Sequence, residues 1–224
     1  MNNVLADILK KGYITLDNGE HLPLHSHLPE LEGRLLQAWL TIHKPKNLLE
    51  IGMAFGVSSL YICDATRSWS INQYDIIDAF QSDQWQGFGV RHLREAGYGD
   101  LYRLHEKRSE LCLPEFLLQG MRFDFAFIDG WHTFDQVLVE FYYINRMLEV
   151  GGMVIFDDMH LPSLQKLSSY IEAYGCYQRL PIPTELKTSK TYRVRQMMQV
   201  PASRIDGFIK TGKDQRDWDW FKDF

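Results

Sequence analysis

Two stretches of the sequence place acids and histidines directly after apolar runs. FAFIDGWHTFD delivers Asp129 and His132, and GGMVIFDDMH delivers Asp157, Asp158 and His160. Carboxylates are the ligands that hard cations such as magnesium prefer, and a histidine can accept a proton near neutral pH. The two stretches therefore predict a site that combines a cation with a general base. Each also has a purely structural interpretation, as a turn or helix cap for the acids and as local packing under Trp131 for His132.

Strands that alternate with helices must position these residues. The expected strands are NLLEIG (47–52), Asn72–Ile77, Leu101–His105, Phe123–Ile128 and Met153–Phe156. The clearest helices are Glu32–His43, VSSLYICDA (57–65) and Phe134–Leu148. Thr133 with Gln136 is expected to form a capping box, and TYRVRQMMQV (191–200) an antiparallel edge strand. This order predicts an α/β fold with a doubly wound, mostly parallel, seven-stranded sheet.

Four acids end four of these strands. Glu50, Asp78, Asp129 and Asp157 all fall at the carboxyl end of their strand. In open parallel sheets that edge is where ligands bind. Carboxylates gathered there need cations or hydrogen-bond donors to meet them, so the sequence predicts a ligand at this edge.

A glycine-bearing turn follows the first of these strands. LEIGMAFGVSS has the spacing Glu50-x-Gly52-x-x-x-Gly56, which differs from the GxGxxG dinucleotide motif. The glycines permit a tight turn and close approach of a ligand, and the next helix begins with free N–H groups. On spacing alone, glycines that serve only the turn explain the motif as well.

The combination of motifs resembles class I S-adenosylmethionine-dependent methyltransferases. The residues that carry the resemblance are LEIGMAFGVSS, IDAFQSDQW, FDFAFIDGWHTFD and GGMVIFDD, and it extends over about 33–170. It is similar to catechol O-methyltransferase-like enzymes and, at the acidic pair, to macrolide sugar O-methyltransferases. It implies a Rossmann-like fold and S-adenosylmethionine as cofactor.

The resemblance also implies roles for individual residues. Glu50, Gly52 and Ser58 are assigned to the methionine end of the cofactor, with the Ser58 hydroxyl meeting its carboxylate. Gly56 is assigned to cofactor binding as part of the same motif. Asp78 is assigned to the ribose hydroxyls and Ser109 to the adenine, although Ser109 could equally be a helix N-cap. Asp129 is placed at both the cofactor and the metal.

The same resemblance implies a magnesium-assisted O-methylation. Asp129, Asp157 and Asp158 are the expected metal ligands, although Asp158 stands where the catechol-type enzymes have Asn. That departure also leaves a metal-free site open, with Asp129 meeting the cofactor's ammonium group. His132 is the expected general base.

Bulk properties limit the partners. The 224 residues, with 45% hydrophobic and 24% charged side chains, predict one globular domain, with 201–224 as a tail. The resemblance implies that 1–31 forms an N-terminal cap over the acceptor pocket. A net charge of −5 disfavours nucleic acid, and no apolar run approaches the roughly 18 residues of a membrane span. Three scattered cysteines without a CxxC motif predict reduced thiols in the cytoplasm.

These observations predict a cytoplasmic S-adenosylmethionine-dependent methyltransferase acting on a hydroxyl of a small molecule, and they leave a homodimer open. Two rival interpretations remain. One is a non-catalytic cofactor-binding partner protein. The other is a metal-dependent oxygenase on a similar scaffold, with His132, His160 and Asp129 as ligands.

Overall fold

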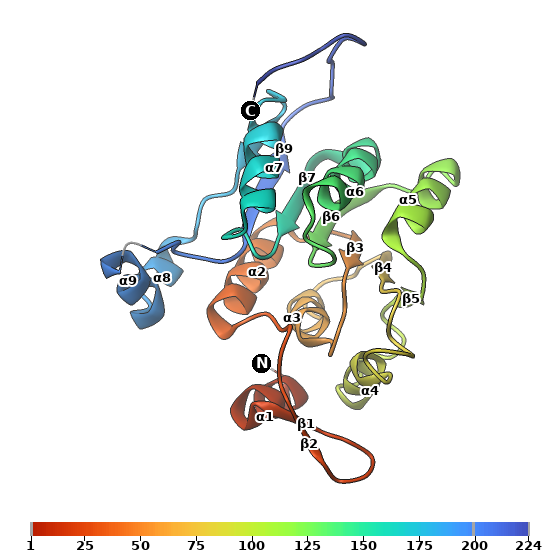
Figure 1. The fold of residues 1–224 in the computed structure, drawn as a ribbon, viewed down its shortest axis with the longest axis vertical. Coiled ribbons are helices and arrows are strands. Elements are labelled where there is room, and N and C mark those ends of the chain that lie inside the picture. Colours follow the sequence, from red (N-terminus) through yellow and green to blue (C-terminus); the bar gives the residue numbers. More distant parts are fainter. Residues whose placement is uncertain (1, 199, 224) are drawn as a thin grey trace.

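The computed structural model describes residues 2–198 and 200–223 and contains a seven-stranded sheet in the order β5-β4-β3-β6-β7-β9-β8 (Figure 1). The parallel strands are β3 (Asn47–Ile51), β4 (Gln73–Ile77), β5 (Arg103–His105), β6 (Phe123–Ile128) and β7 (Leu148–Phe156). Strands β9 (Asp206–Lys210) and β8 (Tyr177–Arg179) complete it in antiparallel pairing. Strand order reverses between β3 and β6, so the sheet is doubly wound as predicted.

Helices cover both faces of this sheet. One apolar cluster packs α1 (Asn3–Lys11), α2 (Glu30–His43), α3 (Val57–Thr66) and α4 (Phe88–Glu95) against it. The other packs α5 (Ser109–Leu118), α6 (Phe134–Met147) and α7 (Pro162–Glu172). In β6, Phe125 and Phe127 belong to the first cluster, and Ala126 and Ile128 to the second. This alternation is why the stretch FAFI, Phe125–Ile128, is apolar throughout.

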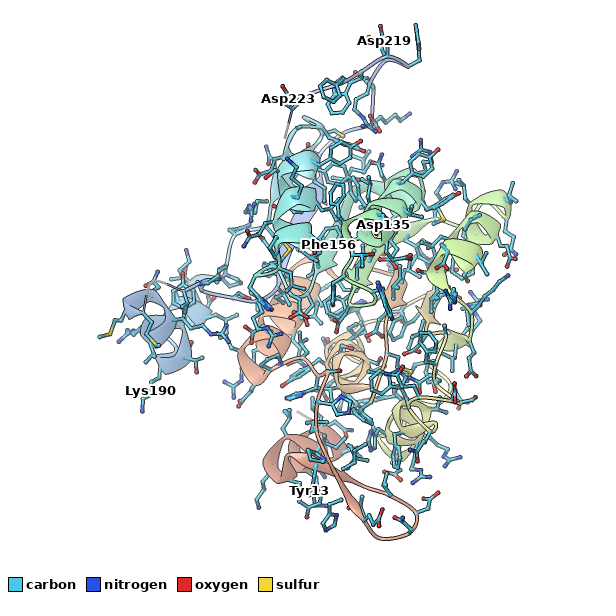
Figure 2. All side chains as sticks on the ribbon, viewed as in Figure 1. Tyr13, Asp135, Phe156, Lys190, Asp219 and Asp223 are labelled. Atoms are coloured by element: carbon cyan, nitrogen blue, oxygen red, sulfur yellow. The ribbon has the colours of Figure 1, made fainter. Side chains whose placement is uncertain are left out.

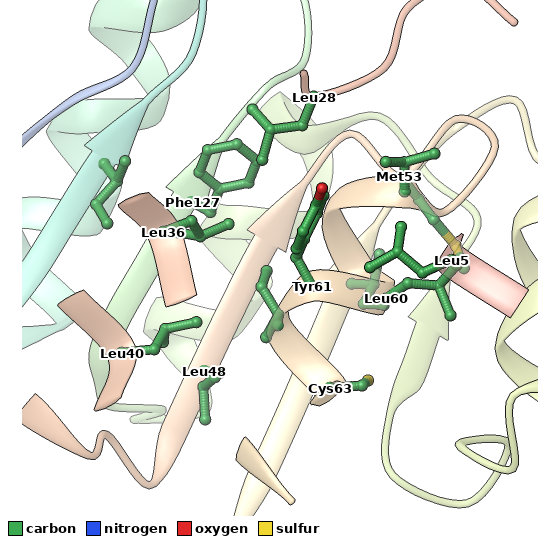
Figure 3. Packing of buried hydrophobic residues seen from close by; sticks show 14 of the residues in the cluster. Leu5, Leu28, Leu36, Leu40, Leu48, Met53, Leu60, Tyr61, Cys63 and Phe127 are labelled. Carbon is green, nitrogen blue, oxygen red and sulfur yellow. The ribbon is translucent and has the colours of Figure 1, made fainter. Parts of the chain in front are cut away.

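Figure 3 shows how tightly the first cluster packs around α3. Leu60 of α3 lies beside Leu5 of α1, Phe127 of the sheet lies beside Leu36 of α2, and Tyr61 of α3 stands between these two groups. A Cβ atom on Gly33 would come within 2.2 Å of the Tyr61 ring. Gly33 thus lets α2 approach α3, which fixes the layer below the glycine turn.

Two local predictions are wrong. The stretch TYRVRQMMQV does not form an edge strand, because Lys190–Met197 is helix α9, capped by the Ser189 hydroxyl. Position 199 lies outside the described residues. The antiparallel edge is made by β8 and β9 instead. Thr133 occupies the N-cap position of α6 but makes no capping hydrogen bond, and Gln136 turns toward α5, so no capping box forms.

Both terminal segments contain regular secondary structure. Residues 13–23 form a hairpin of β1 (Tyr13–Thr15) and β2 (His21–Pro23), and the short helix α8 (Thr184–Lys187) precedes α9. The predicted tail contributes β9 to the sheet, after which Trp220 packs on Tyr174 with ring centroids 5.7 Å apart. Figure 2 labels Asp219 and Asp223 on this outer segment and Lys190 at the start of α9. No helix in the described part of the chain combines the length and apolar character needed to cross a membrane.

Candidate active site

A cavity of about 880 Å³ opens at the carboxyl edge of the parallel strands. Its wall includes Gly52 after β3, Asp78 after β4, Asp129 after β6 and Asp157 after β7. Its volume lies within the range of small-molecule sites. Asp78, Asp129 and Asp157 therefore lie together along this edge, as the sequence predicts. Glu50 does not line the cavity.

The glycine turn brings two strands into contact beside the cavity. Gly52 has φ 89°, and its N–H donates to the Ile77 carbonyl at 2.9 Å. A Cβ atom here would lie 2.0 Å from the backbone oxygen of Asp129. Glycine is thus required both by conformation and by space, and the bare backbone forms part of the cavity wall. Gly56 lies behind this wall as the αL N-cap of α3, and it does not line the cavity.

Glu50 and Ser58 face each other rather than the cavity. The Glu50 carboxyl is fully buried and accepts hydrogen bonds from the hydroxyls of Ser58 (2.6 Å), Ser59 (2.7 Å) and Tyr74. Burial raises the pKa of Glu50 to about 7 despite these donors. Neither Glu50 nor Ser58 lines the cavity, so the predicted contact of the Ser58 hydroxyl with a cofactor carboxylate does not follow from this arrangement. They brace β3 and β4 against α3.

Asp78 secures the glycine turn from the neighbouring strand. Its Oδ2 accepts from the backbone N–H groups of Met53 (2.9 Å) and Ala54 (2.8 Å), and its Oδ1 from that of Phe80 (2.9 Å). It also lines the cavity, as the sequence predicted. Asp78 therefore sits where an acid can meet ribose hydroxyls while it fixes the turn.

Ser109 lines the cavity next to an acid that the sequence reasoning missed. Ser109 is the first residue of α5, after the N-cap Arg108, and its hydroxyl donates to Glu140 Oε1 at 2.6 Å. Gln136 donates to the same carboxyl oxygen at 3.2 Å, while Glu140 Oε2 has no partner among the described residues. Burial raises the pKa of Glu140 to about 7. An acid within an apolar helix stripe, four residues after Gln136, was the available signal.

His132 stands between two carboxylates at the ends of β6 and β7. Its Nε2 lies 3.6 Å from Asp129 Oδ1 and 3.4 Å from Asp158 Oδ2, and its side chain is 20% exposed. Its Nδ1 is buried with no hydrogen-bond partner in the described structure, and Ser163 Oγ holds its backbone carbonyl at 2.6 Å. These separations are longer than hydrogen bonds, so the imidazole lies in the gap between the acids rather than being fixed to either.

Burial and neighbouring charges raise the pKa of two acids near His132, Asp129 and Asp157. Burial, followed by the charges of Asp158 and Glu50, raises the pKa of Asp129 well above its usual range. Burial and Asp129 raise the pKa of Asp157 to about 8. Asp158 has φ 53°, an unusual conformation for a residue other than glycine, and its N–H donates to Asp157 Oδ1 at 2.7 Å. The pair is thus assembled as the sequence predicted, and its charges are unevenly compensated.

Arg204, which the sequence reasoning did not single out, reaches this group from the loop before β9. Its Nη2 donates to Asp158 Oδ1, and it lines the cavity. His160 lies 3.7 Å from the same carboxylate with its side chain 44% exposed. Arg204 lies outside every motif, and only the antiparallel return of β9 brings it here.

The residues present do not fit the predicted magnesium site as they stand. No group of three or more His, Cys, Asp or Glu side chains has a metal-holding arrangement within residues 2–198 and 200–223. The Asp158 carboxylate, one of the three expected ligands, is already paired with the Arg204 guanidinium. The two-histidine, one-carboxylate set of the oxygenase interpretation is not assembled either, because the exposed His160 meets only Asp158.

The N-terminal segment contributes to the wall of the cavity. His25, Ser26, His27 and Pro29 line it, as do Trp131 and His132. The His25 ring packs on Phe55 with centroids 5.2 Å apart. Burial, with the charge of Arg204, lowers the pKa of His27.

The sheet order, the glycine turn and the acid after β4 are the arrangement that the resemblance to class I methyltransferases implies. Residues 49–159 match the family described as Methyltransferase domain. The prediction of a class I S-adenosylmethionine-dependent methyltransferase is therefore confirmed at the level of family and fold.

Solved structures with the same fold agree. The chain is similar to the O-methyltransferase TomG from Streptomyces achromogenes in complex with SAM (17% identity, 95% of this chain and 91% of that one, TM-score 0.65). An O-methyltransferase from Bacillus cereus in complex with SAH gives 16% identity, 94% and 92% coverage and TM-score 0.65. The SAH-bound methyltransferase PaMTH1 from Podospora anserina gives 16% identity, 95% and 89% coverage and TM-score 0.68. At these identities the likeness speaks for the fold alone, and no curated protein sequence matches the chain.

Proposed function

We propose that this protein transfers a methyl group from S-adenosylmethionine to a hydroxyl of a small molecule. The observation that carries the proposal is one cavity that joins the Gly52–Asp78 wall to His132 and the strand-end acids. The cofactor supplies an activated methyl group on sulfur. The related solved structures, described as O-methyltransferases with SAM or SAH bound, support the choice of oxygen as acceptor.

The residues divide the work between two ends of this cavity. The backbone at Gly52 allows close approach of the cofactor, and Asp78 offers acceptors to its ribose hydroxyls. Ser109 and Glu140 lie where the adenine is expected. At the other end, His132 removes the proton of the acceptor hydroxyl through Nε2, flanked by Asp129 and Asp158.

The acceptor end is enclosed by the segment that carries His25 and His27, which supports a small acceptor. A net charge of −5 supports neither nucleic acid nor an anionic membrane surface as partner. Three unpaired, buried cysteines support a reducing, cytoplasmic setting. The single-domain organisation stays a prediction. A homodimer also stays a prediction, and light scattering of the purified protein can test it. Magnesium assistance is not part of the proposal, because the Asp158 carboxylate is already paired with the Arg204 guanidinium.

Calorimetric titration with S-adenosylmethionine and S-adenosylhomocysteine tests the cofactor. We expect both to bind with dissociation constants in about the micromolar range. A panel of phenols and alcohols, assayed for S-adenosylhomocysteine release, then tests the acceptor class. Absence of binding for both nucleosides would overturn the proposal. If the wild-type protein binds these nucleosides but methylates no acceptor of the panel, the non-catalytic cofactor-binding interpretation would be favoured instead.

A further inference from the structure

Arg204 is held in place from two sides. Its carbonyl accepts from the Met159 N–H at 2.8 Å, and its own N–H donates to Glu32 Oε1 at 3.0 Å. Glu32 is fully buried in α2 and is also paired with Arg195 of α9. The backbone of Arg204 is thus anchored to the loop after β7 and to a helix, which aims its side chain at the strand-end acids.

The guanidinium is the fixed positive charge at the acceptor end of the cavity. It donates to Asp158 Oδ1, while its Nε is buried and has no partner in the described part of the chain. Lys107 and Arg108 also line the cavity, but on the loop before α5, next to Ser109. Asp129, Asp157 and Asp158 would otherwise face one another without a permanent counter-charge.

We propose that Arg204 takes the place of a divalent cation at this site, so that the protein works without a metal. An arginine stays charged at any working pH, and its pairing with a carboxylate is charge-assisted. A magnesium ion would have to displace the guanidinium from Asp158 and tolerate a second positive charge nearby. The role of this charge in methyl transfer rests on the proposed function, but the exclusion of metal does not.

Manganese binding, followed by electron paramagnetic resonance in the presence of S-adenosylhomocysteine, tests this directly. Wild type is expected to bind no Mn²⁺ at the site below about 1 mM, because the guanidinium already pairs with one carboxylate and repels a second cation from the others. Arg204→Met removes the charge and keeps much of the length, so it should gain Mn²⁺ affinity by at least about tenfold. The gain should disappear in Arg204→Met/Asp157→Asn and should not appear in Arg204→Lys, which keeps the charge.

Arg216→Met is the matched control. Arg216 pairs with Asp214 at 2.7 Å and is 18% exposed, yet it does not line the cavity. It should leave Mn²⁺ binding as in wild type. Circular dichroism and S-adenosylhomocysteine titration of each variant establish that the fold and the cofactor end are intact. Arg204→Gln replaces Arg204→Met if the latter does not fold.

Two results would overturn the inference. One is Mn²⁺ binding by wild type at about 0.1 mM or below that is lost in Asp157→Asn. The other is equal absence of Mn²⁺ binding in wild type and in both neutral Arg204 variants, since the guanidinium would then not be what excludes the ion. Failure of S-adenosylhomocysteine to bind wild type would instead count against the proposed function.

Discussion

The acids along the sheet edge are met in two different ways. At β3 and β4, neutral hydroxyl groups satisfy Glu50 and backbone N–H groups satisfy Asp78. At β6 and β7, Asp158 is met by the charged Arg204 and flanked by two histidines. In the first region the hydrogen-bond acceptors are satisfied, because the carboxylate oxygens of Glu50 and Asp78 all have donors. In the second region the carboxylates repel one another, and His132 Nδ1 has no partner in the described structure. Such an arrangement is typical of sites that transfer protons.

Gly52 is where these two regions touch, and changing it should have the largest effect. In Gly52→Ala the new Cβ would meet the Asp129 backbone at 2.0 Å in a strained φ of 89°. We expect a loss of about 3–5 kcal/mol in the free energy of unfolding, from the φ strain and the overlap together. Urea unfolding measures it. Gly87→Ala is the control, since Gly87 has φ 71° with nothing within 4 Å, and it should lose only about 1 kcal/mol. Equal losses would show that the contact between the regions can relax.

Glu50 should make stability fall with rising pH. Its pKa is about 7 in the folded chain against an ordinary 4.5, so the folded state holds a proton that the unfolded state releases. This contribution is complete below about pH 4.5 and is lost as pH rises through about 7, an upper bound of about 3 kcal/mol. Glu50→Gln should flatten the dependence of the unfolding free energy on pH between about 5 and 8, since the three hydroxyls can rotate to meet an amide. An unchanged slope would contradict the assignment.

Asp78 should control cofactor affinity without dominating stability. Asp78→Asn places an amide against the N–H groups of Met53 and Ala54 and removes an acceptor from the cavity. We expect S-adenosylhomocysteine to bind about tenfold more weakly by calorimetry. Asp75→Asn is the control, because Asp75 is buried on the same strand but pairs with His105 at 2.8 Å, away from the cavity. It should lower stability and leave affinity within about twofold. The reverse pattern would place the cofactor elsewhere.

The contrast between the regions also explains what the sequence could predict. Parallel strands bring their carboxyl ends to one edge, so an acid after each apolar run was enough to predict the group of Asp78, Asp129 and Asp157. Side-chain direction was not readable in the same way. Ser58 and Ser59 lie in the first turn of α3, eight and nine residues after Glu50. Only the packing of α3 on β3 shows that their hydroxyls donate hydrogen bonds to the Glu50 carboxyl.

The acceptor end depended on long-range pairing, which local patterns do not encode. Arg204 reaches Asp158 because β9 runs antiparallel beside β7, whereas the sequence pattern predicts the antiparallel edge strand at 191–200. Residues 190–197 instead form a helix whose Met197 is 84% exposed, so its apolar residues do not mark a buried strand. An isolated arginine before an unrecognised strand gave no signal of its own.

His160 provides the smallest expected change, and comparison with His132 makes it discriminating. His160 and His132 approach this carboxylate to 3.7 and 3.4 Å, but the side chain of His160 is 44% exposed and lies outside the cavity wall. His160→Ala should therefore change the free energy of unfolding by less than about 0.5 kcal/mol and turnover by less than about twofold. His132→Ala should lower kcat by about 10²–10⁴, the usual share of a general base, with S-adenosylhomocysteine affinity nearly unchanged. Initial rates of S-adenosylhomocysteine release compare the two. If His160→Ala proved the more damaging, the base would lie on the β7 side of the carboxylate pair, and the gap between Asp129 and Asp158 would not be the reacting centre.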